Sequence, residues 1–156
     1  MLSQLEQLSI TAEGRYATPQ ELQPLKNYFP TVSVRLSAYQ KIHECEAEIM
    51  EQLRLKMIEK QPHLTQLSSV NVKTLCGRDI KIVLRIAAAA MLIDDLNRVR
   101  ENILLWQRTI TKAFKIEDIT ALAYSTMPEI VEQFLTPEEF TLIKPILMLN
   151  QAVLAD

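Results

Sequence analysis

One short segment combines a thiol, a guanidinium and a carboxylate at helical spacing. Cys76, Arg78 and Asp79 lie close together in the sequence, and on a helix Cys76 and Asp79 share one face while Arg78 flanks it. A thiol can form a covalent thioether, a carboxylate can accept hydrogen bonds from cationic N–H groups, and an arginine can pair with a carboxylate. This set suits an extended linear tetrapyrrole that is anchored at one end and paired with charges along its length.

The residues after this segment supply an apolar floor. Four apolar residues return to the face of Cys76 at helical spacing: Ile80, Val83, Ala87 and Ala90. Arg85 is expected to point away from that face. Taken singly, Cys76, Arg78 and Asp79 also have ordinary structural interpretations. A lone helical cysteine such as Cys76 is usually a buried structural residue. Arg78 and Asp79 alone are typical of a solvated helix surface.

The composition excludes several classes of function. The chain has 156 residues, about one domain, with 17 basic and 19 acidic residues and a net charge of −2. These mixed charges give no footprint for nucleic acid or for an anionic membrane. The stretch 80–93 is too short and too often charged to span a bilayer, and residues 1–10 do not resemble a secretory signal. We therefore expect a cytosolic protein with no nucleic-acid partner and no membrane insertion.

Neither a metal site nor a catalytic set stands out. Cys45 and Cys76 are the only cysteines and lack the spacing of metal ligands. His43 and His63 both precede Cys76, so no histidine follows where a haem globin needs its proximal ligand. No serine, histidine and acid form a recognisable triad. The sequence predicts no catalytic residues, no metal and no enzymatic activity.

Hydrophobic periodicity predicts an all-α fold. The expected helices share apolar residues every three or four positions and cover 3–10, 18–29, 32–60, 72–93, about 95–114, 116–124 and 136–154. Two of them should start with capping boxes, at Thr18 and Thr136. We expect six to eight helices around one core, with two long antiparallel partners, in a globin-like arrangement rather than a four-helix bundle.

Particular residues refine this outline. Asp94 and Asp95 are expected to form a corner. Pro128 should interrupt a helix, and Pro145 should bend the last one. Two residues at apolar helical positions, Cys45 and Trp106, are expected to lie in the core.

Two stretches then carry a resemblance to a family. Residues 76–85, CGRDIKIVLR, resemble the pigment-attachment motif of phycobiliproteins, Cys-x-Arg-Asp followed at the same spacing by Leu-Arg. Residues 12–16, AEGRY, followed by Thr-Pro at 18–19 and Glu-Leu at 21–22, are similar to the opening of those subunits. Asp95 falls where the family often has a corner aspartate, and in length the chain is most similar to the allophycocyanin group.

The resemblance implies both a fold and a function. The fold is a single globin-like domain over 1–156, in which residues 1–16 form an N-terminal helical extension for subunit pairing. The pigment is phycocyanobilin in a thioether bond to Cys76, with Asp79 contacting the pyrrole nitrogens and Arg78 a propionate. The function is light harvesting in a phycobilisome-type assembly at the thylakoid surface, in the cyanobacterial cytoplasm or the plastid stroma. The partners are a related phycobiliprotein subunit, in a heterodimer that builds rings, and linker proteins.

Some positions depart from the family's pattern. Ile82 and Val83 stand where many members have two aromatic residues, and Ala89 and Thr111 replace tyrosines. Thr11 stands where an aspartate often forms an ion pair between subunits. Without these aromatic residues, the chain has fewer side chains to enclose a pigment. This favours an alternative, a pigment-free regulator, sensor or adaptor that binds phycobilisome components. A helical interaction module unrelated to photosynthesis is a more distant alternative.

Overall fold

The computed structural model describes residues 1–63, 70–99 and 105–154, without the side chains at positions 2, 70–76, 98 and 105. Over these residues the chain is helical and contains no strand, which confirms the all-α prediction. The elements in chain order are α1 (Leu2–Thr11), α2 (Gln23–Tyr28), the 3₁₀ turn η1 (Phe29–Thr31), α3 (Val32–Glu44), α4 (Glu46–Lys60), α6 (Val70–Ile93), α7 (Leu96–Val99), α8 (Leu105–Phe114), α9 (Glu117–Glu132) and α10 (Pro137–Leu154).

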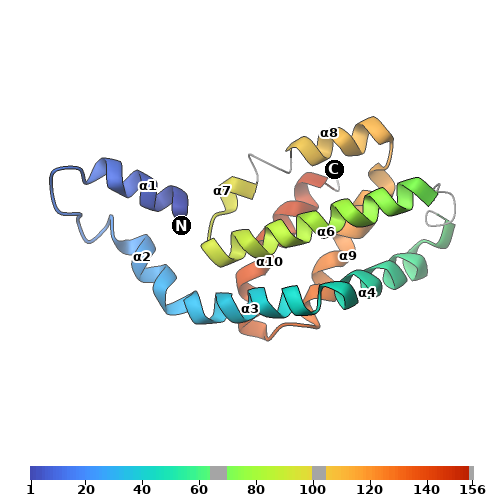
Figure 1. Ribbon diagram of the computed structural model, residues 1–156, viewed down its shortest axis with the longest axis horizontal. Coiled ribbons are helices and arrows are strands. Elements are labelled where there is room, and N and C mark those ends of the chain that lie inside the picture. Colours follow the sequence, from blue (N-terminus) through green and yellow to red (C-terminus); the bar gives the residue numbers. More distant parts are fainter. Residues whose placement is uncertain (64–69, 100–104, 155–156) are drawn as a thin grey trace.

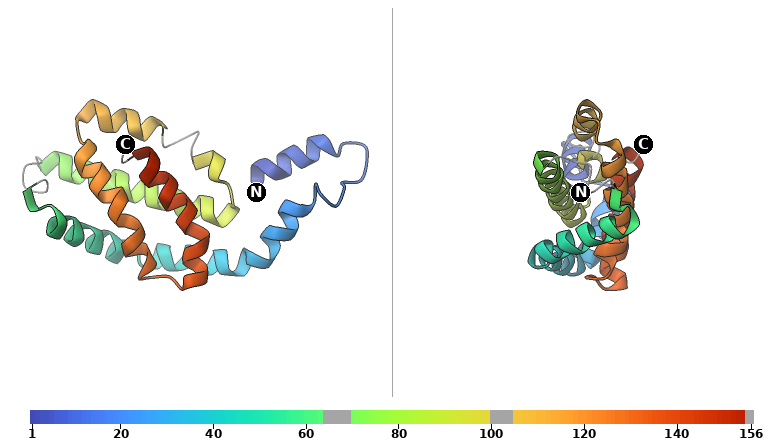
Figure 2. Two further views of the ribbon diagram at one scale, coloured as in Figure 1. Left: turned by 180° about the vertical axis from the view of Figure 1, so that it is seen from behind. Right: turned by 90° about the vertical axis from the view of Figure 1, so that its right-hand side faces the viewer.

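Two antiparallel pairs of long segments build the body of the molecule. The nearly continuous pair α3 and α4 is followed by α6, which runs back in the opposite direction and packs on α3 (Figure 1). The hairpin of α9 and α10 crosses these segments, with α9 against α4 and α10 against α3 and α6 (Figures 1 and 2). α8 packs on α9 and α10. The predicted pair of long antiparallel partners is therefore present.

The core lies where the apolar stripes of these helices meet. Buried residues recur every three or four positions along the long helices, as in Ile42, Ile49, Leu53, Val83, Leu84, Ala87, Met91, Ile143 and Ile146. Each fully buried Leu or Ile side chain contributes about 1.5–3 kcal/mol to folding. The small residues Ala87, Ala88 and Ala90 are all buried on α6, which lets the neighbouring helices α3 and α10 approach closely.

Several predicted boundaries differ from the structure. The expected helix 32–60 is divided at Cys45, whose backbone leaves the helical region at φ −94° and ψ 6°. Cys45 is half-buried at the edge of the core, so the prediction of a core position is only partly met. The helix expected from Thr18 begins only at Gln23, although the capping-box hydrogen bonds of Thr18 and Glu21 are present.

The expected interruption at Pro128 is wrong. α9 continues through Pro128 to Glu132, although a proline inside a helix costs about 3 kcal/mol. Met127, Ile130 and Val131 are buried around the proline, so packing of this segment outweighs the lost hydrogen bond. α10 likewise continues through Pro145, and the bend predicted there stays a prediction.

The prediction that Trp106 is a core residue is also wrong. Its side chain is 61 % exposed, whereas the polar neighbours Gln107 and Thr111 are buried on the inner face of α8. The helix is turned so that the tryptophan faces outward. Apolar periodicity cannot predict such a rotation, because it assumes that the apolar stripe faces the core.

Two corners share one hydrogen-bond pattern at a left-handed residue. Asp94 has φ 50° and Lys115 has φ 54°. After α6, the N–H of Asp95 donates to the carbonyl of Ala90 at 3.0 Å, and after α8 the N–H of Ile116 donates to the carbonyl of Thr111 at 3.1 Å. This is the Schellman ending of a helix, and it confirms the corner predicted at Asp94 and Asp95.

α1 and α2 project from the body as an arm (Figures 1 and 2). Both ends of the arm are attached to the corner that follows α6. The hydroxyl of Ser3 donates to Oδ2 of Asp95 at 2.6 Å, and the hydroxyl of Tyr28 donates to the carbonyl of Leu92 at 2.8 Å. Arg35 strengthens the same corner, since its Nη2 lies 3.0 Å from Oδ1 of Asp94.

Among the described residues, no helix is both long and apolar enough to cross a membrane.

Candidate functional site

The residues singled out by the sequence lie in the first half of α6. The backbone of Cys76 is helical, and its side chain lies outside the described residues. The side chain of Arg78 is 70 % exposed and that of Asp79 is 19 % exposed, and Nε of Arg78 lies 3.7 Å from Oδ1 of Asp79. The helix therefore presents a solvated guanidinium beside a carboxylate that is mostly withdrawn from water.

Asp79 borders a small cavity between α6, α8 and α9. The cavity has a volume of about 10 Å³, which is room for about one water molecule. Its polar walls include Gln107 of α8 and Thr120 and Tyr124 of α9, all of them buried. These three residues were not identified from the sequence, because they come from two helices, α8 and α9, that are distant in the sequence from the motif on α6. One feature of the sequence could have indicated Thr120 and Tyr124. They follow Ile116 at helical spacing, so that they place polar groups on an otherwise apolar stripe.

The positions that depart from the family's aromatic pattern lie on different sides of their helices. Val83 and Thr111 are buried, whereas Ile82 and Ala89 are exposed. The structure therefore does not gather these four positions into one wall. It buries Ile80, Val83, Ala87 and Ala90, as expected for the apolar floor.

Arg85 points away from Asp79, as predicted, and joins α6 to the start of α4. Its Nε and Nη2 donate to the two oxygens of Glu46 at 2.5 and 2.7 Å. These hydrogen bonds lower the pKa of the Glu46 carboxyl, with a smaller contribution from the charge of Lys81. The arginine of the Leu-Arg part of the motif thus links α6 to the start of α4.

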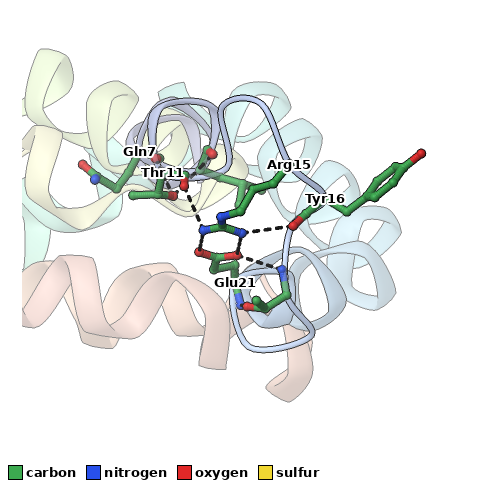
Figure 3. Close-up of polar contacts among 7 residues, drawn as sticks. Gln7, Thr11, Arg15, Tyr16 and Glu21 are labelled. Atoms are coloured by element: carbon green, nitrogen blue, oxygen red, sulfur yellow. Dashed lines mark hydrogen bonds and ion pairs between the residues drawn. The ribbon is translucent and has the colours of Figure 1, made fainter.

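The second motif forms the closed tip of the arm. Arg15 lies between α1 and α2, and its Nη1 and Nη2 donate to the two oxygens of Glu21 at 3.0 and 2.7 Å (Figure 3). The same guanidinium donates to the carbonyls of Thr11 at 2.8 Å and Tyr16 at 3.0 Å. One side chain therefore holds both ends of the loop together.

Glu21 completes the loop through a capping box. The backbone N–H of Thr18 donates to Oε2 of Glu21 at 2.7 Å, and the N–H of Glu21 donates to the Thr18 hydroxyl at 3.3 Å. The hydrogen bond from Arg15, followed by the one from Thr18, lowers the pKa of Glu21 to about 2. Held in this loop, the ring of Tyr16 is 98 % exposed and points away from the molecule (Figure 3).

Thr11 is satisfied within its own helix. Its hydroxyl donates to the carbonyl of Gln7 at 3.0 Å, and its carbonyl accepts from Arg15. The position that lacks the family's aspartate therefore takes part in closing the arm.

Among the described residues, no group of histidine, cysteine and acidic side chains is arranged to hold a metal ion.

Comparison with known families gives a match over most of the chain. The sequence model of a family described as phycobilisome protein matches residues 8–152, which include both motifs and nearly all the helices described above. A search of the curated proteins found no match. Proteins of this family are structural and light-harvesting proteins rather than enzymes, and their all-α fold is globin-like. The helical architecture, the residues around Cys76 and the matched range lead to one conclusion: the chain belongs to the phycobilisome protein family.

Proposed function

We propose that this chain is a light-harvesting subunit of the allophycocyanin type that holds phycocyanobilin through a thioether at Cys76 and passes excitation energy within a phycobilisome. Phycobiliproteins as a class carry covalently bound bilins. The observation that supports the proposal for this chain is the Cys-x-Arg-Asp motif on α6, with the Asp79 carboxylate largely withdrawn from water beside an exposed Arg78.

The charges and their placement fit a linear tetrapyrrole. A carboxylate in a partly dry position is a strong acceptor for cationic pyrrole N–H groups, and Asp79 has that environment. The guanidinium of Arg78 is solvated and suits a flexible propionate. The apolar side chains of Ile116 and Ile119 line the same small cavity as Asp79.

A bound bilin would supply the absorption of visible light. The role of the chain is to position the pigment and keep it rigid. α6 fixes the register of Cys76, Arg78 and Asp79, and the pair of Arg85 with Glu46 fixes the rotation of α6 against α4. A fixed negative charge at Asp79 would shift the absorption band by stabilising the cationic pigment.

The arm supports the proposed assembly. Phycobiliproteins form oligomers with related subunits and linkers, and we propose that residues 1–16 pair this chain with a related subunit in a heterodimer that builds rings. The exposed apolar residues Ile10, Tyr16 and Phe29 lie along the arm, and uncovered apolar surface of this kind is typical of an interface. Because phycobilisomes are peripheral to a membrane, the proposed location is the thylakoid surface.

One observation favours the second candidate, a pigment-free adaptor or regulator that binds phycobilisome components. The cavity beside Asp79 holds only about 10 Å³, and among the described residues Tyr124 is the one aromatic side chain in its walls. This cavity, as the described residues form it, is too small for a tetrapyrrole, so a pigment held by Asp79 would lie outside it.

The deciding experiment is coexpression with enzymes that make phycocyanobilin and with a bilin lyase. We expect a red-absorbing protein whose pigment stays attached in acidic urea and gives zinc-stained fluorescence after electrophoresis. The Cys76→Ala variant should be colourless, whereas Cys45→Ala should keep its pigment. Colourless wild-type protein with every tested lyase would favour the pigment-free candidate, and covalent pigment on Cys76→Ala would overturn the attachment site.

The role of Asp79 needs its own variant. Asp79→Asn removes the charge and keeps the shape of the side chain, so we expect covalent attachment to persist while the absorption maximum moves to shorter wavelength. The exposed Asp118→Asn on α9 is the matched control and should leave the spectrum unchanged. An unaltered spectrum in Asp79→Asn would show that this carboxylate does not contact the pyrrole nitrogens.

A further inference from the structure

A larger cavity lies between α8, the start of α9 and the end of α10. Its volume is about 190 Å³, above the roughly 150 Å³ of an engineered cavity that holds benzene. No residue of the α6 motif lines it. It is therefore separate from the cavity beside Asp79 and large enough for a small organic molecule.

Two basic and two acidic side chains line this cavity. Arg108 and Lys112 are one turn apart on α8, and Glu117 and Asp118 form the first turn of α9. In the described part of the chain, none of these four exposed side chains has an ion-pair partner within 4.0 Å. Arg108 and Lys112 are one turn apart and repel each other, whereas Glu117 and Asp118 are adjacent residues in the first turn of α9. An anionic ligand group would relieve the repulsion on the basic side, and the carboxylates of Glu117 and Asp118 could accept charge-assisted hydrogen bonds from a cationic group.

The floor of the cavity is apolar and contains one unsatisfied polar atom. Ala121, Val153 and Leu154 supply the apolar surface. Thr111 also lines the cavity and is 3 % exposed, and its hydroxyl oxygen is buried without a hydrogen-bond partner. A buried hydroxyl that lacks a partner is unfavourable, so this position favours a ligand that can hydrogen-bond to it.

We propose that the cavity binds a small zwitterion with an aliphatic side chain, of the α-amino acid class. The carboxylate faces Arg108 and Lys112, the ammonium group faces Glu117 and Asp118, and the aliphatic side chain covers the apolar floor. A ligand that is only an anion would be repelled by the acidic wall, and a ligand that is only a cation would be repelled by the basic wall. A zwitterion is the class that satisfies both.

The test compares leucine with two derivatives that each lack one of its two charges. Leucine, N-acetylleucine and leucine amide are titrated at up to millimolar concentration into the full-length protein as expressed, and binding is followed by amide chemical shifts. We expect leucine to bind at least tenfold more tightly than either single-charge analogue, with the shifts confined to α8, α9 and the end of α10. Absence of leucine binding, or equal binding of N-acetylleucine, would overturn the proposal.

Variants of the two walls test the orientation. Arg108→Gln and Asp118→Asn should each weaken leucine binding by about tenfold or more, because each removes a charge-assisted hydrogen bond. Lys115→Gln lies at the end of the same helix outside the cavity lining and serves as the control. Unchanged affinity in both wall variants, with melting temperatures like that of the wild type, would overturn the site.

Thr111→Val keeps the shape of the side chain and removes only the hydroxyl. Because that hydroxyl has no partner in the protein, we expect this variant to melt no lower than the wild type and to bind leucine severalfold more weakly. These measurements do not involve the bilin or Cys76, so a colourless protein would not affect their outcome.

Discussion

Glu139 joins α3 to the start of α10 through one carboxylate. Its oxygens accept hydrogen bonds from the Ser37 hydroxyl at 2.7 Å, from Nζ of Lys41 at 2.8 Å and from the backbone N–H of Thr136 at 2.8 Å. The side chain is only 5 % exposed. Burial alone would raise its pKa, but these hydrogen bonds outweigh burial and lower the pKa from 4.5 to about 2.

The lowered pKa of Glu139 leads to a prediction about acid stability. A carboxyl whose pKa is lower in the folded state stabilises the protein above its unfolded pKa, and that contribution is lost as the pH falls from 4.5 to about 2. We expect Glu139→Gln to lose about 2 kcal/mol of the free energy of unfolding at neutral pH, because Lys41 loses its charged partner. Urea denaturation at several pH values measures this.

The control for that prediction is Glu138→Gln. Glu138 is exposed in the first turn of the same helix, where a carboxylate contributes only about 0.3–1 kcal/mol through the helix dipole. If the stability of Glu139→Gln falls with acid as steeply as that of the wild type between pH 4.5 and 2, the stabilising role of this carboxylate is wrong.

At the scale of the helices, the ends are where backbone strain is concentrated. α6 and α8 both end with a residue other than glycine in the left-handed region, Asp94 and Lys115. Such a residue costs about 1–2 kcal/mol relative to a right-handed conformation, and glycine avoids most of this cost. Asp94 also makes an ion pair with Arg35, whereas within the described structure no ion pair of Lys115 is recorded.

This difference predicts opposite results for the same substitution. Lys115→Gly should raise the free energy of unfolding by about 0.5–1 kcal/mol, because strain is relieved and no contact is lost. Asp94→Gly should give little gain or a net loss, since it removes the partner of Arg35. Thermal denaturation of both variants measures this. A Lys115→Gly variant that melts below the wild type would contradict the strain argument.

The sequence predicted those elements whose causes are local. The capping box at Thr136 is present, since its donors and acceptors are three residues apart. α6 was predicted almost to its limits because its apolar pattern is long and ends at the Asp94 corner. The break at Cys45 and the continuation of α9 through Pro128 were missed. Both depend on how distant helices pack, which a local pattern does not contain.

The same limit applies to the candidate sites. Arg78 and Asp79 were found because they belong to a contiguous motif. The walls of the cavity beside Asp79 come from three helices, so that Gln107 and Tyr124 had no shared signal in the sequence. The outward rotation of Trp106 was equally invisible, because the structure buries polar residues of α8 in its place.

At the scale of the whole molecule, the arm is stiff at its tip and attached at its base. The base contacts are Ser3 to Asp95 and Tyr28 to Leu92, and the tip is closed by Arg15 and Glu21. Because the tip lies at the end of the arm away from the body (Figures 1 and 2), its contacts should matter for association rather than for folding.

The separate roles of the arm in association and of the core in folding lead to a prediction for Arg15→Ala. We expect the variant to unfold at the same denaturant concentration as the wild type but to bind a related phycobiliprotein subunit at least tenfold more weakly, because the loop that presents Tyr16 is no longer preorganised. Sedimentation velocity of mixed subunits measures this. Arg54→Ala, which breaks an exposed ion pair with Glu51 on α4, is the matched control. Equal association of Arg15→Ala and Arg54→Ala would exclude the arm tip from the interface.

The arm is attached to the corner at the end of α6, and the proposed pigment anchor, Cys76, lies near the start of the same helix. α6 therefore holds the arm and the anchor at a fixed distance from each other. Residues 76 and 93 are separated by roughly 25 Å along a straight helix, and α6 is continuous between them. The proposed pigment anchor and the attachment of the arm are therefore the two ends of one rod. Since excitation transfer weakens steeply with separation, the length of α6 would set how far the pigment of one subunit lies from the pigment of its neighbour.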